Sequence, residues 1–76
     1  MRRFIDPEGR PWDVVVGRES WGALYALFIP VEPRPGEPAR QALLRAAGYN
    51  EAHAELASLP DTELAELFRR ATPKDT

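Results

Sequence analysis

The sequence predicts an α+β protein in which a small N-terminal antiparallel β-meander, of three strands and possibly four, packs against C-terminal helices. Three observations predict this class. A Pro-Gly turn lies between two short β-prone segments, an apolar run follows at residues 21–31, and apolar residues recur at helical spacing near the C-terminus. Because the chain has only 76 residues, we expect one domain covering residues 1–76.

The turn at residues 6–9 is the strongest local signal. Asp6 at the first position, Pro7 at the second and Gly9 at the left-handed position are typical of a type I turn followed by a bulge. The turn predicts a hairpin between residues 3–5 and 12–16. In its second strand Trp12, Val14 and Val16 share one face, which we expect to face the core.

A third strand is expected to begin near Trp21 and to complete the meander of residues 1–31. Both alternating sets of the run 21–31 are apolar, which is typical of a strand covered on both faces. A buried helix is the alternative, and Gly22, Ile29 and Pro30 argue against it.

Residues 32–38 form an expected Pro-rich loop, since three prolines and a glycine exclude both a helix and a strand ladder. Residues 39–47 fit either a helix or a fourth strand. Helix-forming residues between Pro38 and Gly48 favour the helix. The alternation of apolar residues at 42, 44 and 46 suits a strand that pairs with the third one through the proline loop.

The C-terminal part, residues 50–72, is expected to be helical. Asn50 is a suitable N-cap for a short helix over 51–58. Pro60 starts the last helix, which has basic residues in its final turn and stops before Pro73. Its apolar positions at helical spacing are Leu64, Leu67, Phe68 and Ala71.

Composition bounds the compartment and the class of partner. The chain lacks cysteine, carries a net charge of −2 at pH 7 and uses nine arginines but one lysine, a bias typical of high-GC bacterial coding. Its start meets an acid and a proline before any apolar core, and its longest apolar stretch is about half of the ~20 residues that a bilayer span requires. We expect a cytoplasmic protein with no membrane association.

Motifs for catalysis, cofactors or metals are missing from the sequence. His53 is the only histidine, and the helical positions of Glu51 and Glu55 do not face it, so we expect a half-exposed surface histidine. The glycines form no phosphate-binding loop, and no serine lies in a nucleophile elbow. The prediction is a non-enzyme without cofactor or metal site.

Surplus aromatic and arginine side chains predict a binding surface, because these residue types dominate interface hot spots. We expect a bacterial protein-interaction module, an adaptor or regulatory subunit that binds a larger protein or itself; a core for the two tryptophans is the competing interpretation. Nucleic-acid binding is the alternative function, against which stands the pI of about 5.3. The candidate partner-binding residues are Arg2, Arg3, Arg10, Trp12, Arg18, Trp21 and Tyr25.

Overall fold

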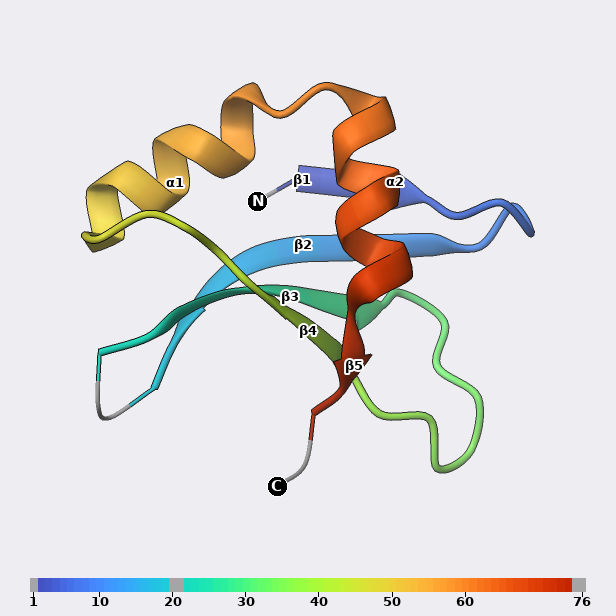
Figure 1. Ribbon diagram of the computed structural model, residues 1–76. Coiled ribbons are helices and arrows are strands. Elements are labelled where there is room, and N and C mark those ends of the chain that lie inside the picture. Colours follow the sequence, from blue (N-terminus) through green and yellow to red (C-terminus); the bar gives the residue numbers. More distant parts are fainter. Residues whose placement is uncertain (1, 20–21, 75–76) are drawn as a thin grey trace.

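The computed structural model describes residues 2–19 and 22–74, and it forms one antiparallel sheet in the order β1-β2-β3-β4-β5 with two helices against it (Figure 1). The α+β class is therefore confirmed. The elements are β1 (Arg2–Ile5), β2 (Pro11–Arg18), β3 (Leu24–Pro30), β4 (Arg40–Leu43), α1 (Tyr49–Ser58), α2 (Asp61–Arg70) and β5 (Thr72–Pro73).

The first hairpin has the predicted turn. Gly9 adopts a φ of 83°, and its amide donates to the carbonyl oxygen of Asp6 at 2.9 Å. The amide of Asp6 in turn donates to the carbonyl oxygen of Arg10 at 2.9 Å and closes the loop. Residues other than glycine disfavour this φ, so Gly9 specifies the type of turn. The turn then fixes the register of the hairpin, in which Phe4 lies opposite Trp12.

The helix favoured for residues 39–47 is wrong, and the strand alternative is correct. β4 pairs antiparallel with β3, with Ala42 opposite Ala26. This pairing buries Ala42 and satisfies backbone groups that the proline loop has brought alongside β3, which outweighs helix propensity. Gly48, expected to end a helix, is instead the N-cap of α1 with φ −127° and ψ 159°.

Both C-terminal helices are present. α1 starts at Tyr49 rather than after Asn50. α2 follows Pro60 as expected, but it ends at Arg70 instead of continuing to residue 72, because Thr72 pairs with β4 as part of β5. The short strand β5 was not predicted, because two residues carry no periodic signal. It returns the chain to the free side of β4, with Thr72 opposite Gln41.

The inner face of the sheet holds the core. As expected, Trp12 and Val14 are fully buried and Val16 nearly so. Phe68 of α2 lies at the centre of an aromatic cluster: its ring centroid is 5.1 Å from that of Phe4, 5.0 Å from that of Trp12 and 5.2 Å from that of Phe28.

Only one face of β3 is covered, which corrects the expectation of a strand buried on both sides. Leu24, Ala26 and Phe28 are buried, whereas Ile29 retains 42% of its surface. The physical reason is that the buried residues of both helices pack against the inner face, so neither helix covers the other side (Figure 1). Neither helix of the described chain has the length and apolar character needed to cross a lipid bilayer.

Candidate functional site

The uncovered outer face of the sheet collects most of the exposed apolar surface. Among residues 2–19 and 22–74, five large hydrophobic side chains are exposed, and all but Tyr49 belong to the outward-facing alternation set. Isolated exposed apolar residues are ordinary in proteins, whereas a contiguous group marks an interaction surface. The four are Ile5 at 55%, Ile29 at 42%, Val31 at 38% and Leu43 at 61%.

Strand register makes this group continuous. Val15 lies opposite Leu27 at the middle of the face, and both are half-buried. Tyr25 lies between Gly17 and Leu43 in the next row. Side chains of the same face that are paired across strands are neighbours, so these residues form a mostly apolar surface, which we call the outer face. The polar residues on it include Arg3, Asp13 and Gln41.

The side chain of Leu27 fills the space above Gly17 on this surface. A Cβ built on Gly17 would lie 2.6 Å from Cδ1 of Leu27, so the leucine occupies the space that a larger residue would need. The lack of a side chain at Gly17 therefore leaves room for Leu27 on the outer face.

The two charged residues on the outer face near the edge strand β1 neutralise each other. Arg3 donates from Nε to Oδ1 of Asp13 at 2.8 Å, and the two residues are cross-strand partners. Because each charge is compensated by its neighbour, an apolar partner that covers them meets no isolated charge. Of the predicted partner-binding residues, Arg3 and Tyr25 lie on this face.

Two other predicted arginines serve the structure of the chain itself. Arg2 donates to the carbonyl oxygen of Leu56 at 2.8 Å and to Oδ1 of Asp61 at 2.9 Å, which joins β1 to both helices. Arg10 binds the carboxylate of Glu37 with two hydrogen bonds, of 2.7 and 2.6 Å. This bidentate pair fastens the Pro-rich loop to the first hairpin.

Trp12 is not available to a partner, which corrects its place among the candidate residues and confirms the core interpretation for it. Its side chain is fully buried, and Nε1 donates to Oδ2 of Asp6 at 3.0 Å. The guanidinium groups of Arg10 and Arg40 lie 5.2 and 5.4 Å from its ring centroid. With both neighbours in place, the ring has no free surface on which a base could stack.

The remaining predicted residues are dispersed. Arg18 is exposed at the end of β2, where it pairs with Leu24 of the inner set. Trp21 lies outside the described residues. His53 is exposed as expected and makes an edge contact with Tyr49, with ring centroids 4.6 Å apart. The predicted set therefore does not form a single surface.

The buried carboxylate of Asp6 is committed to the hairpin. Its Oδ1 accepts from the amides of Glu8 at 2.9 Å and Arg10 at 2.8 Å, while Oδ2 accepts from Trp12. Burial by itself raises the pKa of Asp6, but these three hydrogen bonds and the charge of Arg10 outweigh it, so the pKa lies below its ordinary value. A carboxylate held ionised in this way is a structural anchor.

Sequence reasoning missed the residues that define the outer face. Ile29 and Val31 were expected in a strand covered on both faces, because both alternating sets of residues 21–31 are apolar. Ile5 and Leu43 were assigned to no face. The number of helices could have indicated this face. Two short helices can cover one face of a five-stranded sheet, and they leave the other face open.

No protein-family model matches the chain, and neither the curated proteins nor the solved structures contain a similar one. Within residues 2–19 and 22–74, histidine, aspartate and glutamate side chains form no group of three that could hold a metal ion.

Proposed function

We propose that the chain is a non-catalytic protein-interaction module of the bacterial cytoplasm, and that its outer face binds a second copy of itself. The observation that carries this proposal is the gathering of Ile5, Ile29, Val31 and Leu43 on one uncovered face. Two sheets that pack face to face approach to about 10 Å and remove such side chains from water, which is favourable by about 25 cal/mol per Å² of apolar area.

Self-association suits the charge of the outer face. A two-fold interface places each patch against its own copy, so an unpaired charge near its centre would meet a like charge. The pairing of Arg3 with Asp13 and the apolar pair Val15 and Leu27 at the centre avoid this repulsion.

The size of the face sets the expected strength. Strands β1 to β4 have 4, 8, 7 and 4 residues. At about 4.8 Å between strands and about 3.4 Å per residue, they cover a footprint of roughly 400 Å². The accessible area of the side chains is larger than this footprint, but it does not exceed the area of about 800 Å² per partner that a standard interface buries. We expect a dimer with a dissociation constant on the order of 10 μM.

Small size adds a reason for association. A chain of this length buries only about 60% of its unfolded surface and gains little stability from one core. Since the sequence has no cysteine, disulfides cannot supply the deficit. Covering the outer face would therefore stabilise the fold as well as the dimer.

Sedimentation equilibrium tests the proposal with two matched variants. Ile29→Glu and Tyr49→Glu each place a carboxylate at a similarly exposed apolar position, 42% and 46% exposed, but only Ile29 lies on the outer face. We expect wild type and Tyr49→Glu to dimerise at 100 μM and Ile29→Glu to remain a monomer. A monomeric wild type at 1 mM, or equal dimerisation of all three proteins, would contradict the proposal.

A further inference from the structure

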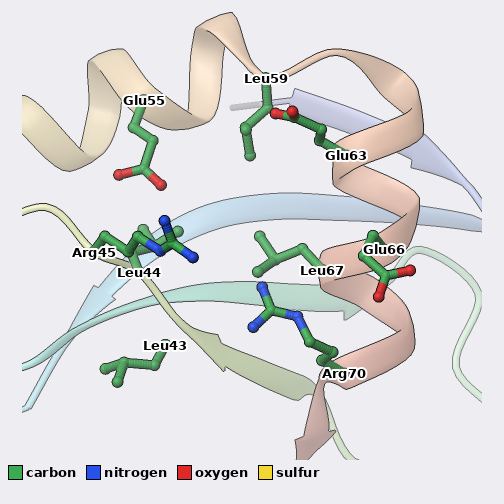
Figure 2. A pocket seen from close by; sticks show the side chains of 9 residues that line it. All are labelled: Leu43, Leu44, Arg45, Glu55, Leu59, Glu63, Glu66, Leu67 and Arg70. Carbon is green, nitrogen blue, oxygen red and sulfur yellow. The ribbon is translucent and has the colours of Figure 1, made fainter.

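A second surface, away from the centre of the outer face, combines an apolar floor with charged walls. It is a pocket of about 500 Å³ between the end of β4 and the two helices (Figure 2). This volume lies within the roughly 300–1,000 Å³ usual for ligand sites. Its floor is formed by Leu44, Leu59 and Leu67, of which Leu44 and Leu67 are core residues with 6% exposure each.

Two arginines enter the pocket from different elements. Arg45 follows β4 and Arg70 ends α2, and Figure 2 shows their guanidinium groups directed toward each other across the pocket. Neither arginine takes part in any of the ion pairs found in the described part of the chain. Guanidinium groups that converge without an acid between them are suited to bind a carboxylate from outside.

The opposite wall is acidic. Glu55 of α1 and Glu63 of α2 lie on the helical side of the pocket and also take no part in those ion pairs (Figure 2). A third acid, Glu66, is bound by Arg69, whose Nε donates to Oε2 at 3.0 Å. In Figure 2, Glu55 and Glu63 thus lie toward the connection between the two helices, whereas Arg45 and Arg70 lie nearer to β4 and the end of α2.

The geometry points to a peptide C-terminus as the ligand of this pocket. Its carboxylate would lie between Arg45 and Arg70, its last side chain, a large aliphatic one, would cover the leucines, and a basic residue upstream would meet Glu55 and Glu63. Each element of the ligand matches one feature of the pocket, and a peptide C-terminus supplies all three in one molecule. The pocket meets the outer face at Leu43, which belongs to both. The variants that test the two proposals, Ile29→Glu and Arg70→Gln, lie away from this shared residue, so either proposal can fail without the other.

The test uses a synthetic pentapeptide with an acetylated N-terminus, one lysine, three alanines and a C-terminal leucine with a free carboxylate. It is titrated into the ¹⁵N- and methyl-labelled full chain, and shifts are followed at Leu44, Leu59 and Leu67. The matched protein variants are Arg70→Gln, which removes a charged side chain from the pocket, and Arg18→Gln, which changes an exposed arginine of β2 that does not line it. Both residues are exposed, so both variants retain the core.

We expect saturable shifts at the three leucines, with affinity weakened about tenfold by Arg70→Gln, about tenfold by amidation of the peptide and less than twofold by Arg18→Gln. Replacement of the peptide's lysine by glutamate should weaken binding further. The proposal is overturned if the leucines do not shift at 5 mM peptide, if the amidated peptide binds equally well, or if Arg18→Gln weakens binding as much as Arg70→Gln. Equal binding of octanoate would show a site for small carboxylates and would also overturn the assignment to a peptide.

Discussion

The indole Nε1 of Trp12 donates a 3.0 Å hydrogen bond to Oδ2 of Asp6, and both side chains are buried. This contact joins the first turn to the largest side chain of the core. Because the same carboxylate also accepts two backbone amides of the turn, the local geometry of the hairpin and the packing of the sheet depend on one residue.

Asp6→Asn should therefore destabilise the protein at neutral pH. An amide has one acceptor oxygen, so it cannot serve both the turn amides and the indole, and a buried donor remains without a partner. We expect a loss of about 1–3 kcal/mol in the free energy of unfolding, measured by urea titration followed by circular dichroism. Asp13→Asn, which changes a half-buried surface carboxylate, is the control and should cost less than about 1 kcal/mol. Equal losses for both variants would contradict the anchoring role of Asp6.

Acid should weaken the attachment of the Pro-rich loop. The two hydrogen bonds from Arg10, with the amide of Arg34, lower the pKa of Glu37 from its ordinary value of 4.5 to about 2. A depressed pKa means that the pair stabilises the folded chain fully above pH 4.5, and that this stability is lost as the pH falls through 4.5 toward 2.

Glu37→Gln reveals this contribution. We expect the variant to be less stable than wild type at pH 7 and to approach it below pH 2, as measured by thermal unfolding across the pH range. Glu32→Gln, in the same loop, has an exposed side chain, and it should leave the profile unchanged. A constant difference between Glu37→Gln and wild type at every pH would show that the carboxylate does not titrate as described.

Phe68 should be the most sensitive core position. It contacts the rings of Phe4, Trp12 and Phe28, so Phe68→Ala removes the centre of the cluster and leaves a cavity. Such truncations cost about 3–5 kcal/mol, comparable to the whole stability of a domain this small. We expect loss of cooperative thermal unfolding, whereas Phe68→Leu should still unfold cooperatively. A cooperative transition in Phe68→Ala near the wild-type temperature would refute the central role of this ring.

Gln41 should be replaceable with a gain in stability. Its Oε1 is buried and accepts no hydrogen bond within the described chain, which lowers the free energy of unfolding. Gln41→Met preserves length and removes the unsatisfied acceptor, so we expect about 1 kcal/mol of added stability in urea titration. A loss of that size would indicate that the amide group has a partner in solution.

The sequence predicts an element correctly where the residues of one short segment determine its structure. Asp6, Pro7 and Gly9 specify their turn by side-chain bonding and allowed φ values within four residues. The signals for the last helix are also local, since Pro60 precedes its first residue and Leu64, Leu67 and Phe68 lie on one side of it.

Features that depend on distant partners could not be read in the same way. Residues 39–47 carry helix formers, but β3 supplies a pairing edge that the segment itself does not encode. The outer face was missed for a related reason: periodicity shows that both sides of residues 21–31 are apolar, but not how many layers cover them. The pocket required the ends of β4 and α2 to meet, so Arg45 and Arg70 carried no sequence signal.

Methyl NMR on dilution tests the central claim most directly, because it reports the outer face residue by residue. Between 1 mM and 10 μM protein, we predict that the methyl signals of Val15, Leu27 and Ile29 shift together along one binding curve. The signals of Leu56 and Leu64, buried on the inner side, should stay in place. Outer-face signals that do not change over this range, or shifts confined to the helices, would contradict the account.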